Sequence, residues 1–262
     1  MIVIGINGYK SFIAANFLKK YKKKYKIKHF KGDINNIDEF KVFTKKSKFT
    51  YFIHFAGLSR QKCSSNKDHC LKINYIATKK TIDFLNTLKL KPVFIFISSS
   101  HVYDKSKYKL NENSTVKPSG LYGKLKLKSE NYIKKNYEKH SILRLFNVYG
   151  KNQPASFFIS DMINKIKNKQ TITIDNSVKD FIDVNEVSKI INFIITKKIL
   201  TTINVASGHG VSLLNVIKNI SKKINIKPLV VQNKASNKVL ADISLLKFLG
   251  YKNKKNEKYF NI

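Results

Sequence analysis

The stretch most informative about the fold is Ile2-Val3-Ile4-Gly5-Ile6-Asn7-Gly8-Tyr9-Lys10-Ser11, directly after Met1. Its first residues, Ile2–Ile6, form an apolar run as long as a short buried strand. After Ser11, apolar side chains recur at helical spacing as far as Tyr21. The glycines between the two segments favour a tight turn. The sequence therefore predicts a strand, a glycine turn and a helix.

The same alternation of strand and helix patterns continues to about residue 150, without internal repeats or a long linker. Predicted strands are Tyr25–Phe30, Phe49–Phe55, Pro92–Ile97 and Ser141–Phe146, and predicted helices are Cys70–Leu88 and Gly120–Lys139. Such alternation predicts an α/β fold with a parallel, doubly wound sheet and right-handed crossovers. Residues 181–206 are expected to return to this main domain, whereas about 151–180 and 207–262 are expected to form a small C-terminal lobe.

The charge of the chain bears on whether the protein binds nucleic acid. The formal net charge of +35 comes from 49 lysines and two arginines, Arg60 and Arg144, set against 16 acidic residues. Strongly basic surfaces attract nucleic acids. Here, however, the lysines are scattered along the chain and no nucleic-acid-binding module is recognisable, so no specific nucleic-acid partner is expected.

The two cysteines and the apolar runs indicate a cytoplasmic protein. Cys63 and Cys70 lie seven residues apart without a set of metal-ligand partners, so we expect free thiols in a reducing compartment and no bound metal. Met1 is followed directly by the first strand, no signal peptide is visible, and the apolar runs are too short to span a membrane.

One helix is expected to carry a proton-transferring pair. Within Gly120-Leu121-Tyr122-Gly123-Lys124-Leu125-Lys126, a phenol and an ammonium four residues apart share one helical face. A neighbouring cation favours the phenolate, so Lys126 is predicted to lower the pKa of Tyr122 from its usual ~10 and make it a general acid or base. The same spacing joins Tyr75 to Lys79, Tyr103 to Lys107 and Tyr251 to Lys255, as chance would give in a lysine-rich chain.

Neighbouring motifs distinguish the pair at 122 and 126. Ile97-Ser98-Ser99-Ser100-His101-Val102-Tyr103 precedes it, Leu143-Arg144-Leu145-Phe146-Asn147-Val148-Tyr149-Gly150 follows it, and the glycine turn opens the chain. Together they make the chain resemble the extended short-chain dehydrogenase/reductase family, specifically its nucleotide-sugar epimerases, dehydratases and reductases, along nearly its whole length. The resemblance implies a dinucleotide-binding Rossmann domain in residues 1–150 and about 181–206, and a substrate-binding lobe in the remainder. It also implies a homodimer formed by a four-helix bundle of helices 70–88 and 120–139.

The resemblance assigns a cofactor site. Gly5 would allow the tight turn, Gly8 the close approach of a pyrophosphate to the helix N-terminus, and Ser11 replaces the family's third glycine. The other implied contacts are Tyr9, Lys10, Lys31, Asp33, Ile34, Phe55, Ala56, Gly57 and Asn74, with Tyr122 and Lys126. Most family members hold the ribose with an acidic residue after the second strand, where this chain has His29-Phe30-Lys31. Lys31 can meet a 2′-phosphate, so NADP is slightly favoured over NAD.

The resemblance also assigns catalytic roles. Ser99, with Ser100 as the fallback, would hydrogen-bond the sugar oxygen, and Tyr122 would move its proton. Lys126 would anchor the nicotinamide ribose. His101 is either an acid or base, or a structural or sugar-contacting side chain.

Substrate contacts are implied for Arg60, Arg144, Asn147 and Lys179, although Arg144 could equally form a buried structural ion pair. Dehydratases of the family place Asp and Glu after the catalytic hydroxyl, whereas this chain has Ser100 and His101. That leaves a 4-keto-sugar reductase, which we favour, or a C4 epimerase. A non-catalytic dinucleotide-binding regulator on the same fold is the other class, and the intact Ser99, Tyr122 and Lys126 argue against it.

Overall fold

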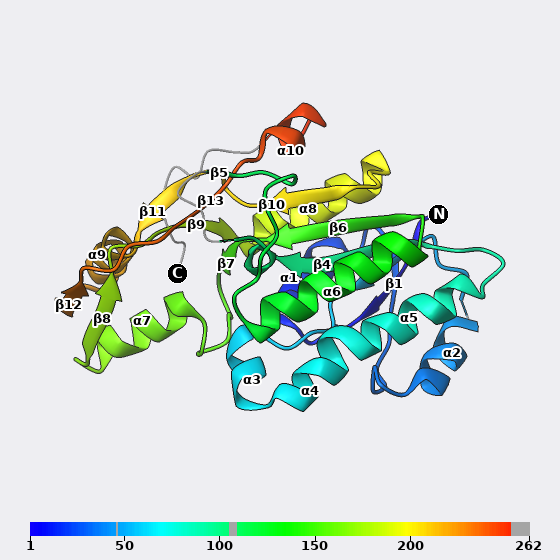
Figure 1. Cartoon of the computed structure of the whole chain (residues 1–262), viewed down its shortest axis with the longest axis horizontal. Coiled ribbons are helices and arrows are strands. Elements are labelled where there is room, and N and C mark those ends of the chain that lie inside the picture. The colour runs from blue at the N-terminus through cyan, green and yellow to red at the C-terminus, as the bar shows by residue number, and fades with distance from the viewer. Residues whose placement is uncertain (46, 105–108, 253–262) are drawn as a thin grey trace. The chain divides into compact units, whose positions relative to one another are not determined.

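The computed structural model describes residues 1–45, 47–104 and 109–252 (Figure 1). The chain divides into two compact units. The first unit comprises residues 1–104, 115–145 and 191–203, and the second comprises 105–114, 146–190 and 204–262. Each unit has its own hydrophobic core.

A six-stranded sheet with the order β10-β6-β4-β3-β1-β2 forms the centre of the first unit. Its strands are β1 (Val3–Asn7), β2 (Lys26–His29), β3 (Tyr51–His54), β4 (Val93–Ser99), β6 (His140–Leu145) and β10 (Thr202–Val205). The pairings of β1 with β2 and β3, of β3 with β4, and of β4 with β6 are parallel. The predicted parallel, doubly wound sheet is therefore confirmed. The strand order reverses at β1, and ligands of such folds bind beyond the carboxyl ends of the strands at this point.

Helices cover both faces of this sheet. They are α1 (Phe12–Tyr21), α2 (Ile37–Lys45), α3 (Arg60–Ser65), α4 (Lys67–Leu71), α5 (Ala77–Asn86), α6 (Leu121–Asn136) and the end of α8 (Val184–Lys197). Phe52, Phe94 and Phe96 alternate along their strands and pack in one cluster with α2, α5 and α6. On the other face, the Tyr51 hydroxyl donates to the Ile195 carbonyl of α8 (2.9 Å). Strands buried on both sides explain the near-continuous apolar runs in the sequence.

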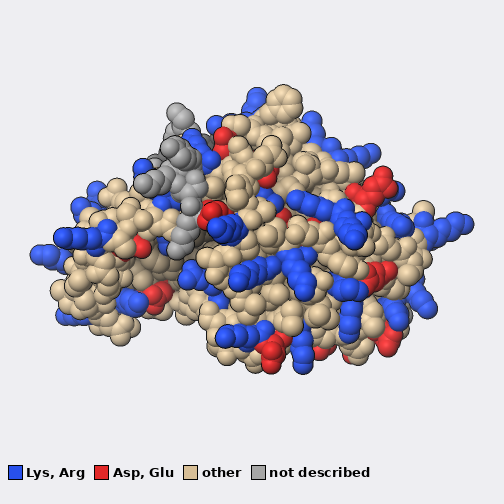
Figure 2. Space-filling model, in the orientation of Figure 1, with Lys and Arg blue, Asp and Glu red and all other residues tan. Residues whose placement is uncertain are grey.

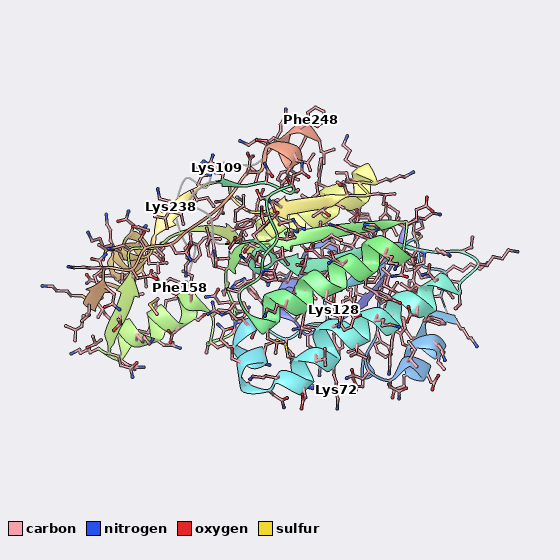
Figure 3. The ribbon with its side chains drawn as sticks, in the orientation of Figure 1. Lys72, Lys109, Lys128, Phe158, Lys238 and Phe248 are labelled. Atoms are coloured by element: carbon pink, nitrogen blue, oxygen red, sulfur yellow. A yellow bond between two sulfur atoms is a disulfide. The ribbon has the colours of Figure 1, made fainter. Side chains whose placement is uncertain are left out.

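The predicted helix 70–88 is interrupted by a π-helical turn. This turn, η1 (Lys72–Ile76), lies between α4 and α5, and Asn74 on it is buried. Lys72 on η1 and Lys128 on α6 are labelled in Figure 3, and the Lys128 ammonium lies 4.3 Å from the centroid of the Tyr75 ring. π-Helical turns inside α-helices are frequent at functional sites.

The second unit has a smaller sheet in the order β11-β9-β13-β5, with β7 also paired to β9, and a separate β12-β8 pair. The strands are β5 (Lys109–Leu110), β7 (Asn147–Tyr149), β8 (Thr171–Asp175), β9 (Val178–Asp183), β11 (Gly210–Ser212), β12 (Leu229–Asn233) and β13 (Lys238–Ala241). Its helices include α7 (Phe158–Lys167), α9 (Leu213–Ile224) and α10 (Ser244–Phe248). Ile159, Ile172 and Val216 join α7, β8 and α9 in one apolar core.

The face of the molecule shown in Figure 2 is basic, and its basic side chains are not confined to one stripe. Figure 2 shows lysines distributed across the visible face, with acidic side chains interspersed. None of the helices in the described part of the chain combines the length and the apolar character that a membrane span needs.

Candidate active site

Three residues of α6 meet three consecutive residues at the end of β4. Tyr122, Lys126 and Glu130 are four residues apart and therefore share one helical face. The Lys126 ammonium donates to the Ile97 carbonyl (2.8 Å), and the Ser98 hydroxyl donates to the Glu130 carboxylate (2.5 Å). Tyr122 is hydrogen-bonded to the Ser99 side chain. The structure thus brings together the predicted Ser99, Tyr122 and Lys126.

Gly123 allows this close approach. A Cβ atom at this position would lie 2.2 Å from the His101 carbonyl oxygen, far inside van der Waals contact. His101 belongs to the short 3-10 helix η2 (Ser100–Val102), which follows β4 directly. Any side chain at position 123 would push α6 away from the strand end and separate the phenol from the serine.

His101 lies next to the Ser99 hydroxyl. The Ser99 Oγ atom accepts a hydrogen bond from the His101 backbone N–H (3.3 Å) and lies 3.1 Å from the His101 Nδ1 atom. The His101 and Tyr122 rings meet edge to face, with centroids 5.5 Å apart. Ser100 starts η2 and is buried. An exposed imidazole is therefore in contact with the same hydroxyl that bonds Tyr122.

The predicted lowering of the pKa of Tyr122 is wrong for this structure. Burial raises the pKa of Tyr122, and the hydrogen bond from Ser99 lowers it by less. The Lys126 ammonium is directed at the Ile97 carbonyl and at the Phe96 ring, whose centroid is 4.7 Å away. Burial also lowers the pKa of Lys126 to about 8, and Glu130 opposes that shift.

Among the other Tyr-x-x-x-Lys pairs, the one whose two residues the structure describes, Tyr75 with Lys79, has a different environment. Tyr75 and Lys79 lie on η1 and α5, where Lys79 forms an exposed ion pair with Asp83 (2.8 Å). Lys107 and Lys255 lie outside the described residues.

The glycine turn is tied to the end of β3. Gly8 has φ +61°, and a Cβ there would lie 2.5 Å from the Ala56 backbone nitrogen, so only glycine fits. The Asn7 side chain accepts from that same Ala56 N–H (3.0 Å). Ser11 is the N-cap of α1 and accepts from the Ala14 N–H (3.4 Å). Gly5 is buried within β1, and a Cβ there would lie 2.7 Å from the Phe52 ring.

A buried histidine that the sequence analysis did not single out orders this turn. The Asn7 amide nitrogen lies 2.8 Å from His54 Nδ1, and His54 Nε2 lies 3.1 Å from the Thr78 hydroxyl. Burial, with a smaller contribution from Lys126, lowers the pKa of His54 to about 3. The ring is therefore neutral and acts as a hydrogen-bonding spacer. Its position in the segment His54-Phe55-Ala56-Gly57 is the sequence signal that could have identified it.

The segment after β3 leaves room beside the Lys126 ammonium. Gly57 is exposed, and a Cβ there would lie 3.2 Å from the Lys126 Nζ atom and 3.0 Å from the Asn74 Oδ1 atom. Phe55 is buried against Phe17 of α1, with ring centroids 6.0 Å apart. A glycine turn at a helix start, small residues at 56 and 57, and an ammonium beside them fit a dinucleotide.

The cysteines form a disulfide, which overturns the prediction of free thiols. Cys63 and Cys70 are bonded, with Cα atoms 4.9 Å apart, because consecutive short helices α3 and α4 fold back on each other. The Asn74 amide nitrogen lies 3.1 Å from the Cys63 sulfur and 3.3 Å from the Cys70 sulfur. Its amide oxygen accepts from the Leu58 N–H (2.8 Å). Asn74 therefore connects the disulfide to the loop carrying Gly57.

Aromatic and basic side chains gather at the tip of β2. The Tyr9 ring stacks on His29 with centroids 4.7 Å apart, and the Lys10 ammonium lies 5.8 Å from the Tyr9 ring. Lys31 is exposed. No acidic side chain ends this strand in the sequence, which runs His29-Phe30-Lys31.

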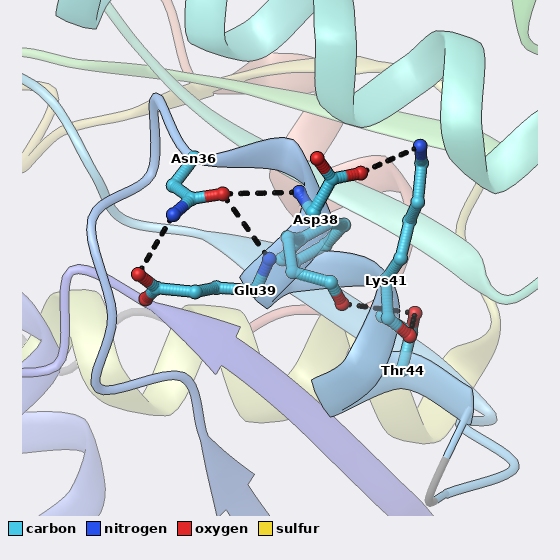
Figure 4. A network of polar contacts seen from close by, with 6 residues as sticks. Asn36, Asp38, Glu39, Lys41 and Thr44 are labelled. Atoms are coloured by element: carbon cyan, nitrogen blue, oxygen red, sulfur yellow. Dashed lines mark hydrogen bonds and ion pairs between the residues drawn. The ribbon is translucent and has the colours of Figure 1, made fainter.

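The segment with the predicted cofactor contacts Asp33 and Ile34 is followed by a helix cap (Figure 4). The Asn36 side chain accepts from the Asp38 and Glu39 backbone N–H groups (3.2 and 3.3 Å) and donates to the Glu39 carboxylate (2.8 Å). Such a reciprocal cap stabilises the first turn of α2. Just before it, Asp33 is exposed and Ile34 is buried in the core.

Arg144 is in the buried ion pair that the sequence left open as the alternative to substrate binding. It is 2% exposed, its Nη2 atom lies 2.7 Å from the Glu130 carboxylate, and its guanidinium stacks 4.7 Å from the Tyr103 ring. Arg60 is exposed at the start of α3.

The remaining predicted substrate contacts lie in the second unit. Asn147 donates to the Asp180 carbonyl (2.8 Å), and the Lys179 ammonium lies 6.0 Å from the Phe158 ring. The Asp180 carboxylate is buried and accepts from the Ser207 N–H (2.8 Å), the Ser207 hydroxyl (2.7 Å) and the Gly208 N–H (2.9 Å). Contact of Asn147 or Lys179 with a substrate stays a prediction.

Comparison with known proteins agrees with this arrangement. A GDP-6-deoxy-D-talose 4-dehydrogenase from Aggregatibacter actinomycetemcomitans is 28% identical over 229 residues, which are 81% of this chain and 77% of that protein. A UDP-glucose 4-epimerase from Thermus thermophilus, in complex with NAD, superposes with a TM-score of 0.85 at 14% identity, covering 97% of this chain and 94% of that one. A dTDP-4-dehydrorhamnose reductase from Bacillus anthracis, in complex with NADP, gives 0.84 at 19% identity, covering 97% and 95%.

At these identities the solved structures establish the fold alone. Residues 4–206, well over half of the chain, match the sequence pattern of one family. The chain belongs to the NAD dependent epimerase/dehydratase family.

Proposed function

We propose that the protein is an NAD(P)-dependent oxidoreductase that reduces the 4-keto group of a nucleotide-activated hexose. The observation that carries this proposal is the docking of α6 on the end of β4, which places Tyr122 on Ser99 with Lys126 one turn away. A hydroxyl, a phenol and an ammonium at the switch point of a Rossmann sheet can bind and protonate a carbonyl oxygen.

The residues that would hold the dinucleotide are those of the glycine turn and the β3 loop. Gly8 and the start of α1 would take the pyrophosphate, and Gly57 leaves space beside Lys126 for the ribose. When bound, the reduced nicotinamide supplies the hydride. Lys31, Lys10 and His29 at the tip of β2 favour a 2′-phosphate, so we propose NADP over NAD.

Tyr122 acts as the proton donor. Because burial raises its pKa, the phenol is protonated at neutral pH and can give its proton to the oxygen that becomes negative. Ser99 bonds the same oxygen and holds the carbonyl in place. His101, exposed and 3.1 Å from Ser99, orients that hydroxyl and connects it to solvent.

The choice of substrate rests on the relatives and on what is missing after Ser99. The Aggregatibacter relative is named for oxidation at C4 of a nucleotide-linked 6-deoxyhexose, and the Bacillus reductase for reduction of a 4-keto group. Ser100 and His101 replace the acidic pair of the dehydratases. C4 epimerisation is the second candidate, because the same residues serve a reversible hydride transfer and the Thermus epimerase has the same fold.

The test uses GDP-, dTDP- and UDP-linked 4-keto-6-deoxyhexoses with NADPH or NADH. We expect stoichiometric loss of nicotinamide absorbance with one nucleotide. Tyr122→Phe should lower turnover by roughly 10²- to 10⁴-fold, whereas Tyr132→Phe, on the same helix, should not.

Interconversion of a C4 pair without net consumption of the nicotinamide would identify the epimerase instead. Dinucleotide binding without either reaction would favour the non-catalytic regulator.

We also propose a homodimer through the neighbouring helices α5 and α6. These helices are in contact within the first unit, and the Tyr132 hydroxyl of α6 donates to the Asp83 carboxylate of α5. Light scattering after gel filtration should give twice the chain mass. A monomer at micromolar concentration would contradict it.

A further inference from the structure

The disulfide between Cys63 and Cys70 lies directly behind the candidate active site. Its sulfurs share an apolar cluster with Leu125 of α6, and Leu58 and the predicted catalytic Tyr122 pack against that cluster. We propose that the two cysteines are a redox-modification site: the disulfide form binds the dinucleotide tightly, and reduction by a dithiol loosens the binding site. This inference rests on the proposed function.

Asn74 joins the disulfide to the loop that follows β3. Its amide nitrogen lies 3.1 Å from the Cys63 sulfur and 3.3 Å from the Cys70 sulfur. The same nitrogen donates to the Leu58 carbonyl (3.2 Å), and the amide oxygen accepts from the Leu58 N–H (2.8 Å). One side chain in contact with both sulfurs therefore holds both backbone groups of Leu58. Gly57, one residue earlier, borders the space proposed for the ribose.

The disulfide also holds the segment between the β3 loop and η1. Among residues 60–72, all of which the structure describes, Cys63 and Cys70 are the only buried side chains. Helices α3 and α4 in this segment are six and five residues long, too short to be stable by themselves. Both contact α6 (Figure 1).

Loss of the cross-link should therefore allow this segment to open. Segments with few buried contacts open locally at a low cost in free energy, and a disulfide restricts the chain that it closes. Opening would carry the two sulfurs away from Asn74. The Leu58 backbone would then lose the support of its hydrogen-bond partner, and the edge of the dinucleotide site would lose its fixed position.

The modification is a two-electron thiol–disulfide exchange. A thiolate of the dithiol attacks one sulfur, the bond between Cys63 and Cys70 breaks, and a mixed disulfide forms. The second thiol of the reductant resolves this intermediate and closes the reductant into its own disulfide. Two protons are taken up, and both cysteines become thiols. Because both sulfurs are buried, the attack follows a local opening of residues 60–72.

The first experiment compares the oxidised protein with the protein reduced by dithiothreitol, both shown to be folded by circular dichroism. We expect reduction to raise the dissociation constant of NADPH, measured by nicotinamide fluorescence, by roughly 5- to 150-fold, the usual range of coupling between two sites. By linkage, saturating NADPH should shift the equilibrium with dithiothreitol toward the protein disulfide by the same factor.

The matched control is Cys63→Ala with Cys70→Ala, which leaves no cysteine in the chain. This variant should bind NADPH as weakly as the reduced wild type and should not respond to dithiothreitol. An unchanged dissociation constant on reduction of the wild type would overturn the inference, and so would an equal response of the variant without cysteines.

Hydrogen exchange provides a test that needs neither a dinucleotide nor a variant. The Leu58 N–H, bonded to the Asn74 side chain, should lose protection when the wild type is reduced. The Phe94 N–H, which donates to the Lys139 carbonyl (2.8 Å) at the start of β4, should keep its protection. Equal loss at both amides would mean global destabilisation and would contradict the local effect. If Leu58 responds but the oxidised protein binds neither NADPH nor NADH, the proposed function fails and the coupling of the disulfide to the β3 loop stands.

Discussion

Among the described residues, each unit contains one fully buried carboxylate, and the two are stabilised in different ways. In the first unit, Glu130 pairs with the Arg144 guanidinium and also accepts from Ser98. In the second unit, Asp180 is held by Ser207 and Gly208, and no described ion pair includes it. Both side chains are 0% exposed.

Glu130 and Asp180 differ in whether a counter-charge that does not change with pH lies beside the carboxylate. Arginine keeps its proton at any pH at which the protein folds, so Glu130 has a permanent counter-ion. Hydrogen bonds alone do not offset desolvation: burial raises the pKa of Asp180 to about 6, although the bonds from Ser207 and Gly208 lower it. The Arg144 charge beside Glu130 should therefore stay constant near neutrality, whereas the loop around Ser207 should respond to pH.

The largest effect is expected from breaking the ion pair. Arg144→Met should lower the free energy of unfolding by about 3–5 kcal/mol, because it leaves the Glu130 charge buried and unpaired. The measurement is urea unfolding at neutral pH. Lys165→Met is the control, because its ion pair with Asp161 is exposed and should contribute less than about 1 kcal/mol. Equal losses for the two variants would show that the buried ion pair contributes no more to stability than the exposed one.

Asp180→Asn should remove a pH dependence. With a pKa of about 6 in the folded state and 3.8 as the ordinary value, folded Asp180 binds a proton more tightly than the unfolded chain does. Its contribution to stability is therefore full below about pH 4 and is lost as pH rises through about 6, a difference of roughly 3 kcal/mol. The variant should lack this gain on acidification, as followed by urea unfolding across that range.

Asp175→Asn is the control of opposite sign. The nearby Ser177 side chain and the hydrogen bond from the Ser177 backbone N–H (3.0 Å) lower the pKa of Asp175, so its contribution is present at neutral pH and lost on acidification. If Asp180→Asn left the pH dependence of stability unchanged, the proposed difference in pH response between Asp180 and Glu130 would be contradicted.

Removal of the disulfide provides a reference in which stability changes but no charged group is altered. Replacing Cys63 and Cys70 with Ala should cost about 2.5 kcal/mol by the chain-entropy estimate for a loop of about eight residues. Because no titrating group is removed, the loss should be the same at about pH 5 and about pH 7. Reduction of the wild type with dithiothreitol should lower the free energy of unfolding by the same amount. A loss of stability that differed strongly between the two pH values would contradict the assignment of the pH dependence to Asp180.

The smallest effects are expected for the two serines. Ser98→Ala and Ser207→Ala each remove a hydroxyl donor to a buried carboxylate and should cost roughly 1–3 kcal/mol. Ser207→Ala should also raise the pKa of Asp180 further, seen as stability lost at a higher pH. Ser98→Ala should leave the pH dependence as it is, because Arg144 still lies beside Glu130 as its counter-charge.

Patterns local in sequence predicted the fold and the parts of the site. The run from Ile2 to Ser11 predicted a strand, a turn and a helix, and the structure places β1, Gly8 and α1 there. Helical spacing gave Tyr122 and Lys126 a common face, and the neighbouring motifs distinguished this pair from the three others with the same spacing. Ser99 was implied by the resemblance of residues 97–103 to the family's motif.

Features that depend on register between distant segments could not be predicted in this way. Arg144 meets Glu130 because Ser98 pairs with Arg144 in the β4–β6 register. The fold-back that joins Cys63 to Cys70 depends on Ser59 and Asn66 capping two short helices, which spacing alone does not reveal. The direction of the pKa shift of Tyr122 depends on how much water its surroundings exclude, and sequence does not report that.

On one side the six-stranded sheet ends at β2, whose partner among the described strands is β1. A bare sheet margin can recruit a strand from another molecule and start aggregation. Here the margin carries Lys26 and Lys28, with Lys31 just after it. Two copies meeting margin to margin at β2 would bring like charges together, so these lysines disfavour pairing between two copies at this margin.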